Sequence, residues 1–177
     1  MDNPIETEKT VEHTNISLIY SYTEYRIKLA NDSINVLNTK LSSVLGFSAT
    51  SIVFSINLPN QAFIPNPSYS YLCYSCLIIK IAVCVFLAVT IFICVKGLIP
   101  KSLGAMTPPE ILMNEYYYDT DENCKLVITK TWIEALKEFE MLRDEKAKIA
   151  NIAITALCGA ALLAACSIIL ASILSML

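Results

Sequence analysis

The sequence has few of the residues on which most enzyme sites depend. The chain contains one histidine, His13, and one CxxC motif, formed by Cys73 and Cys76. A zinc site is therefore not expected, because four such ligands are needed. The four glycines are too scattered for a phosphate-binding loop, since they stand at positions 46, 97, 104 and 159. We expect no enzyme activity, no metal site and no cofactor.

Charge is also missing from two long stretches. Residues 59–76 and 149–177 contain no Lys, Arg, Asp or Glu, although the chain has 13 basic and 16 acidic residues. The resulting net charge of −3 argues against a basic groove for nucleic acid. Acidic residues between 134 and 145 follow the pattern of a solvated helix face.

Three apolar stretches indicate a membrane protein. Hydrophobic residues make up 55% of the chain and the mean hydropathy is +0.54, both high for a soluble protein. Crossing a bilayer takes about 20 apolar helical residues, and residues 77–98 and 149–177 meet that length. Residues 41–58 are shorter and rich in hydroxyl groups, so a soluble core helix is the alternative there. The sequence predicts an all-α membrane protein with three transmembrane helices.

The distribution of charge predicts the topology. Twelve of the 13 basic residues fall on one side of the predicted membrane, counting Lys96 at the inner end of the second span, and this bias marks the cytoplasmic side. We expect residues 1–40 inside, a hairpin of spans over 41–98 with loop 59–76 outside, residues 99–148 inside, and the last span from 149 to 177. Residues 1–40 show no signal-peptide pattern. Lys80 is the one charge that this topology does not explain: it lies about one turn inside the outer end of the second span, either snorkelling to the outer interface or marking an ion route.

A continuous N-terminal helix is expected to enter the first span. No Gly or Pro interrupts residues 15–45, and Leu18, Tyr22, Tyr25 and Leu29 recur at helical spacing. This stripe either packs on the chain's own cytoplasmic part or forms a membrane-surface or gate helix. Residues 1–14 are expected to be loosely attached.

The cytoplasmic part should contain one short and one long helix. Thr107 followed by two prolines predicts a helix that begins there, with Thr107 as its N-cap, and ends near Tyr118. The turn 119–123 resembles the start of an EF-hand, but Cys124 replaces the glycine of the loop and Lys130 its final glutamate, so no calcium site is expected.

A strict 4-3 apolar repeat then runs from Ile128 to Leu174 and predicts one helix of about 50 residues. The repeat can pack against the chain's own helices or join copies of the chain, and it is long enough to do both. Small residues in the last span favour close helix approach in both cases. The candidate seam residues are Trp132, Phe139, Leu142, Ala153, Ala156 and Ala160.

Polar residues inside the spans are the candidates for a conducting path. Ser48, Ser51 and Ser55 share one face of the first span, and Asn151 and Thr155 lie one turn apart at the inner end of the third. The serines either line water or bond back to the carbonyl four residues earlier. At the outer end of the second span, Cys73 and Cys76 are expected to be either two thiols or a disulfide.

This layout resembles a known class of bacterial proteins over about residues 35–177. The matching features are an Asn38-Thr-Lys40 step into the first span, a Lys96-Gly-Leu-Ile-Pro-Lys101 boundary, and an amphipathic helix over Thr131–Lys148 that enters the last span. It is similar to the small transmembrane effectors of anti-phage nucleotide-signalling systems, the Pycsar and Hailong membrane effectors.

The resemblance implies a homo-oligomer in the inner membrane, with the N-terminus in the cytoplasm, that permeabilises the bilayer and arrests growth. Its gating signal would be a nucleotide second messenger made by a partner nucleotidyltransferase, or a partner protein. The alternative is a non-conducting membrane-anchored adaptor that recruits a cytosolic partner through residues 101–148.

Overall fold

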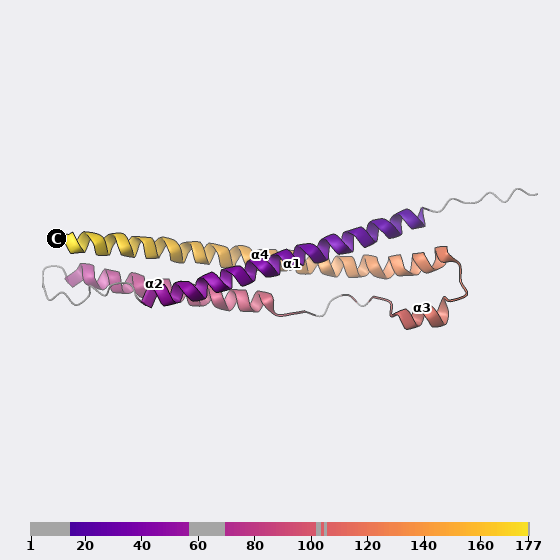
Figure 1. Ribbon diagram of the computed structural model, residues 1–177, viewed down its shortest axis with the longest axis horizontal. Helices are drawn as coiled ribbons and strands as arrows, with labels where there is room; N and C mark the ends of the chain where they lie inside the picture. Colours follow the sequence, from indigo (N-terminus) through magenta and orange to yellow (C-terminus); the bar gives the residue numbers. More distant parts are fainter. Residues whose placement is uncertain (1–14, 57–69, 102–103, 105, 177) are drawn as a thin grey trace, which may run out of the picture. The chain divides into compact units, whose positions relative to one another are not determined.

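The computed structural model of the chain describes residues 15–56, 70–101, 104 and 106–176, with side chains omitted at 70–73 and 174–176. Helices make up 91% of the described residues, and no strand occurs among them. The elements are α1 (Ile16–Ile56), α2 (Ser70–Leu98), α3 (Pro109–Glu115) and α4 (Asp121–Met176) (Figure 1). The predicted all-α fold class is therefore confirmed.

Three of the four helices are long and apolar enough to cross a membrane, namely α1, α2 and α4. The most apolar window is in α2 and the least apolar in α1, as its hydroxyl-rich sequence implies. Helix α2 begins at Ser70, so residues 70–76 of the expected external loop are helical. The rest of that loop, 59–69, lies outside the described residues, as do the N-terminal segment 1–14 and His13.

The chain divides into two compact units. The first unit comprises Met1–Leu29 and Leu103–Phe139, and the second comprises Ala30–Ser102 and Glu140–Leu177. All three predicted spans belong to the second unit. The two units are described separately below.

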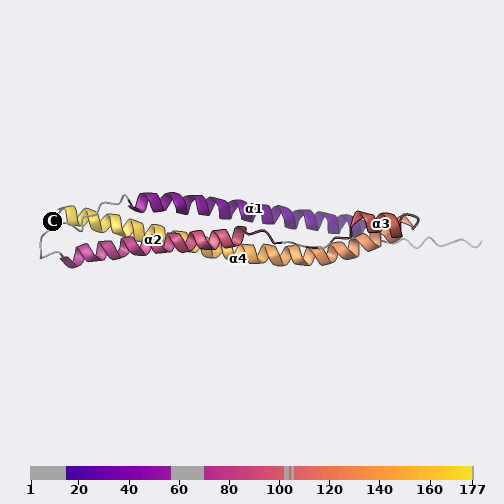
Figure 2. The same ribbon diagram turned by 90° about the horizontal axis from the view of Figure 1, so that it is seen from below.

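In the second unit, α1, α2 and the C-terminal part of α4 pack along two apolar clusters. One cluster contains Leu41, Cys94, Ala150 and Ala153, and the other contains Val83, Leu87 and Ala160. Figure 2 shows α2 running beside this part of α4. The contribution of α4 to both clusters is alanine, which allows the helix axes to come close.

Gly97 marks the closest approach in this unit. A Cβ atom at this position would lie 2.8 Å from Ile149 Cγ2 and 3.0 Å from Leu41 Cδ1. Three helices therefore meet at a point where only hydrogen fits. By contrast, a Cβ at Gly46 would meet nothing within 4 Å.

In the first unit, the connection before α3 packs on α4. Gly104 adopts a positive φ of 50° and donates its backbone N–H to Glu138 Oε2 at 2.6 Å. A Cβ at Gly104 would lie 3.0 Å from Ala135 Cβ, so glycine is required by both conformation and space. Nearby, the rings of Tyr20 and Trp132 stack with centroids 4.8 Å apart.

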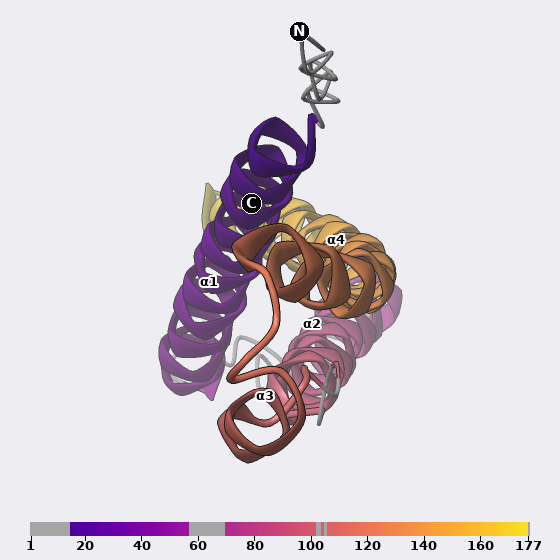
Figure 3. The same ribbon diagram turned by 90° about the vertical axis from the view of Figure 1, so that its right-hand side faces the viewer.

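The start of α3 differs from the prediction in one detail. Pro108 occupies the N-cap position, Pro109 is the first helical residue, and no side chain caps the helix. The Thr107 hydroxyl donates instead to Thr131 Oγ1 at 3.1 Å, and that hydroxyl donates to the Ile128 carbonyl at 2.9 Å. Thr107 is thus not an N-cap, because a contact with α4 takes its hydroxyl group. Figure 3 shows α3 joined by a short turn to the first residues of α4.

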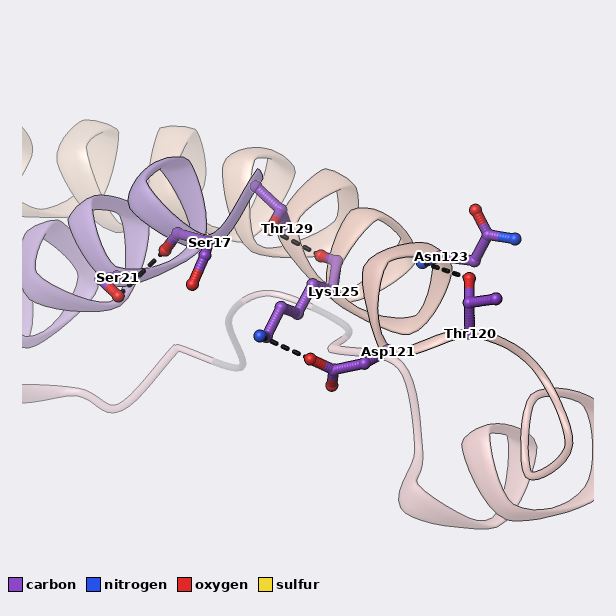
Figure 4. A network of polar contacts seen from close by, with 7 residues as sticks. All are labelled: Ser17, Ser21, Thr120, Asp121, Asn123, Lys125 and Thr129. Carbon is purple, nitrogen blue, oxygen red and sulfur yellow. Dashed lines mark hydrogen bonds and ion pairs between the residues drawn. The ribbon is translucent and has the colours of Figure 1, made fainter. Parts of the chain in front are cut away.

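Helix α4 begins at Asp121, within the acidic turn, and runs for 56 residues. Thr120 Oγ1 accepts the Asn123 N–H at 3.4 Å, which is N-cap geometry, and Lys125 Nζ donates to Asp121 Oδ2 at 2.7 Å (Figure 4). Asp119 Oδ1 accepts from the Asn123 side chain and the Thr120 backbone, and these bonds lower the pKa of Asp119. The acidic residues of the turn thus serve to start a helix.

Candidate functional site

The three serines predicted to line a path lie on the packing face of α1. Ser48 and Ser55 are buried within the unit, and Ser51 is half-buried. The Ser55 hydroxyl donates to the Ser51 carbonyl at 2.8 Å, the back-bonded alternative. Ser48 Oγ has no hydrogen-bond partner within the described part of the chain.

Ser51 and Ser55 border a groove of about 360 Å³ between the three helices of the second unit. The remaining lining is apolar, and alanines of α4 form much of one wall. The lining residues are Ser51, Phe54, Ser55, Val83, Leu87, Leu157, Ala160, Ala161, Ala164, Ala165 and Ile168. In a single chain Ser48 and Ser55 are therefore covered by other helices, whereas Ser51 is partly exposed at the groove, and a conducting role for the three serines stays a prediction.

A second polar stripe of α1 faces outward. Thr39, Ser43, Gly46 and Thr50 follow one another at 4-3-4 spacing, and all four are exposed. Each hydroxyl donates to the carbonyl four residues earlier: Thr39 to Asn35 at 3.0 Å, Ser43 to Thr39 at 3.0 Å, and Thr50 to Gly46 at 2.9 Å. Their oxygen lone pairs still point away from the unit and can accept hydrogen bonds. We name these four residues the outer stripe.

Sequence reasoning missed the outer stripe although the signal was present. Both stripes of α1 have helical spacing, and the outer stripe contains three hydroxyl groups as well. The missing information was which face of α1 packs against α2 and α4. Leu41 decides this, because it is fully buried in the three-helix cluster and fixes the rotation of the helix.

Asn151 and Thr155 are both exposed on α4, and the Thr155 hydroxyl donates to the Asn151 carbonyl at 2.8 Å. The two residues are thus joined on the exposed surface of α4, whereas Ser48 and Ser55 are buried. Their predicted place on a conducting path stays a prediction.

Part of the predicted oligomer seam is occupied within the chain. Leu142, Ala153 and Ala160 are buried, and Ala156 and Phe139 are half-buried. Trp132 is half-buried as well and stacks on Tyr20. These contacts favour internal packing, one of the two alternatives that the 4-3 repeat allowed.

Lys80 has an acceptor inside the second unit. Its Nζ donates to the Ile56 carbonyl at 3.2 Å. Ile56 is the last residue of α1, so its carbonyl has no partner within that helix. A cation at a helix C-terminus also interacts favourably with the helix dipole. The intramembrane charge thus caps α1.

Lys146 makes a comparable contact at the other end of α2. It is 5% exposed, and its Nζ donates to the Gly97 carbonyl at 2.7 Å and to Asn38 Oδ1 at 2.8 Å. One ammonium group therefore joins α4 to the last turn of α2 and to α1. Burial lowers the pKa of Lys146; the positive charge of Lys101 lowers it further, and the charge of Glu145 opposes both effects.

The acid nearest in sequence to Lys146 is bound elsewhere. Glu145 pairs with Lys101, whose Nζ lies 2.7 Å from Glu145 Oε1, and both side chains are about half exposed. This hydrogen bond lowers the pKa of Glu145. The two acceptors of Lys146 are neutral oxygens, so its charge is held without a carboxylate.

Comparison with other proteins does not add to this geometry: no protein-family model, curated protein or solved structure matches the chain. Among the described residues, no three His, Cys, Asp or Glu side chains are grouped so that they could hold a metal ion. The Cys73 side chain lies outside the described residues, so the alternatives for Cys73 and Cys76 stay open.

Proposed function

We propose that the protein is a homo-oligomeric membrane channel or pore whose water-facing surface is the outer stripe of α1. The observation that supports this is the contrast between the exposed faces of two spanning helices. On α2 the exposed positions one heptad apart are Ile78, Val85 and Phe92, between 54% and 72% exposed. Such side chains suit lipid.

The exposed surface of α1 is mixed. Phe47, Val53 and Phe54 are between 59% and 69% exposed, and beside them the outer stripe presents three hydroxyl groups and, at Gly46, an uncovered backbone. The hydroxyl hydrogens are bonded within the helix, but lipid tails offer the remaining oxygen lone pairs no hydrogen-bond partner. A face of this composition is better matched by water or by a close-packed helix of another copy, and an assembly of several copies provides both.

The resemblance in layout supports the biological role within this proposal. The assembly would permeabilise the inner membrane during anti-phage defence and cause growth arrest, with the N-terminus and residues 99–148 in the cytoplasm. The gate would respond from that side to a nucleotide second messenger or to a partner protein. The polar cytoplasmic segments, in contrast to the charge-free stretches 59–76 and 149–177, support control from inside.

Ion flux through liposomes that contain the purified protein tests this proposal. Gly46→Leu adds bulk to the outer stripe where the single chain has room for it, so the variant should fold and yet conduct less. Ala88→Leu is the control, because Ala88 is exposed on α2 and the substitution adds nearly the same bulk, three carbon atoms instead of four. Equal flux through both variants, or no flux from the wild-type protein with any nucleotide added, would contradict the proposal.

One observation favours the adaptor as a second candidate. In the first unit, the apolar stripe of Leu18, Tyr22, Tyr25 and Leu29 is between 48% and 71% exposed. Within the described part of the chain about half or more of each of these side chains stays uncovered, and both alternatives drawn from the sequence stay open. Stable binding of a cytosolic protein to this stripe, without any ion flux, would support the adaptor.

A further inference from the structure

We propose that Lys146 is a positioning residue that latches the three spanning helices together at Gly97, and that the channel conducts when this latch is released. The second half rests on the proposed function, whereas the latch itself does not. The ammonium group of Lys146 makes two bonds, which reach residues 108 and 49 positions away in sequence and connect α4 to α1 and α2.

The chemistry of the site is unusual for a purely structural contact. A buried cation loses its hydration, and two neutral oxygens return only part of that free energy. An apolar side chain of similar length would leave the Gly97 carbonyl and the Asn38 side-chain oxygen without this donor. What lysine adds is a contact that water can replace, since an ammonium group is strongly hydrated once it leaves the site.

The position of the site gives the latch its effect. Gly97, whose carbonyl accepts from Lys146, is also where Ile149 and Leu41 come closest to α2. While the ammonium is seated, α1 and α4 are held at the last turn of α2. Once it leaves, the carbonyl of α2 and the amide of Asn38 are free to be solvated, and the three helix ends can separate.

Of the two charges that act on Lys146, Lys101 favours release and has the larger effect, whereas Glu145 opposes release. Lys101 follows α2 and repels Lys146, and Glu145 of α4, the nearby acid, is engaged by Lys101. Lys96 lies close enough to act on Glu145. From α1 the contact is the uncharged amide of Asn38. The cation is therefore held by geometry rather than by an opposite charge.

Amide hydrogen exchange of residues 94–98 in the full-length protein, in lipid nanodiscs, measures the latch without any ion flux. Lys146→Met removes the charge and keeps an unbranched side chain. Exchange at this end of α2 should accelerate about ten- to hundred-fold, which corresponds to the free energy of a hydrogen bond to a charged group. Lys148→Met is the matched control, since Lys148 is exposed, and it should exchange like the wild type. Unchanged exchange in Lys146→Met would overturn the latch.

A double-mutant cycle tests whether Asn38 and Lys146 act as one unit. Asn38→Ala should accelerate exchange by a smaller factor, and the double variant should behave like Lys146→Met alone. Additive effects would mean that the two residues act separately, which contradicts the latch. If Lys146→Met loses its helical circular dichroism signal, Asn38→Ala becomes the test of the latch. Unchanged exchange in Asn38→Ala would then overturn the proposal.

Flux through liposomes then separates the two proposals. Suppose that the wild type conducts on stimulation. Without a stimulus, Lys146→Met should then conduct about ten-fold more than the wild type, because the same hydrogen-bond free energy is lost. Lys148→Met should conduct like the wild type. Accelerated exchange with no flux from any variant would reject the channel and leave the latch standing. Stimulated flux in the wild type with no effect of Lys146→Met on exchange or on flux would reject the latch and leave the channel standing.

Discussion

Replacing Gly97 by alanine should destabilise the second unit, although alanine is the better helix former. The added Cβ would lie 2.8 Å from Ile149 Cγ2 and 3.0 Å from Leu41 Cδ1. Leu41 can move its terminal methyl group, but the Cγ2 of a β-branched side chain moves only with a change of χ1. The strain therefore falls mainly on Ile149.

The expected magnitude follows from two opposing effects. Exchange of glycine for alanine within a helix gains up to about 1 kcal/mol, and this gain is smaller for Gly97 because α2 ends at Leu98. Overpacking of a tight contact costs about 1–3 kcal/mol. We expect Gly97→Ala to lower the free energy of unfolding by about 1–2 kcal/mol, since overpacking is the larger of the two effects.

Thermal unfolding in detergent micelles, followed by circular dichroism, measures this change. Gly46→Ala is the matched control because its Cβ meets nothing within 4 Å, and it should stabilise the protein by up to about 1 kcal/mol. In an Ile149→Ala background the cost of Gly97→Ala should largely disappear, because the obstructing methyl group is gone. A Gly97→Ala protein as stable as Gly46→Ala, or an unchanged cost in the Ile149→Ala background, would refute the reasoning.

Three further predictions concern single contacts. Ser48→Ala should raise the free energy of unfolding by about 1 kcal/mol, because the buried Ser48 hydroxyl has no partner among the described residues. An unfolding temperature below that of the wild type would contradict this prediction. Tyr20→Ala and Trp132→Ala should show a coupling of about 0.5–1.5 kcal/mol in a double-mutant cycle of unfolding, whereas additive effects would mean that the rings do not interact. Thr120→Ala should lower the free energy of unfolding by about 1 kcal/mol and accelerate amide exchange in the first turn of α4. Thr120→Ser keeps the N-cap hydroxyl and should exchange like the wild type. Equal exchange in both variants would exclude the cap.

The helices themselves could be predicted from local sequence. Uninterrupted apolar periodicity predicted α1 and α4 as long continuous helices, and Pro108 and Pro109 predicted the start of α3. These features depend on residues within a few positions of one another. The structure confirms these helices, because local sequence is sufficient to determine where they form.

The rotation of each helix could not be predicted in this way. Helix α1 has two polar stripes of similar spacing, and burial of Leu41 against Cys94 and Ala153 determines which stripe faces outward. The same limit applies to Lys146, because its partners Asn38 and Gly97 come from distant parts of the chain. Contacts of this kind are set by packing and leave no local pattern in the sequence.

Lys80 shows how a charge inside a span can be explained only in three dimensions. The sequence left snorkelling and an ion route as alternatives, whereas the structure adds a bond to the last carbonyl of α1. Lys80 and Lys146 thus cap the C-termini of α1 and α2 respectively. Each contact joins two helices through residues that are far apart in the sequence.

The most direct test of the channel is the accessibility of α1 during conduction. Single cysteines at 39, 43, 46 and 50, in a protein whose seven native cysteines are replaced, would be treated with a charged thiol reagent while liposome flux is measured. The account predicts that modification reduces flux at these four positions and leaves it unchanged at 78, 85 and 92 on the apolar face of α2. Flux that is insensitive at all four positions of the outer stripe would contradict the account.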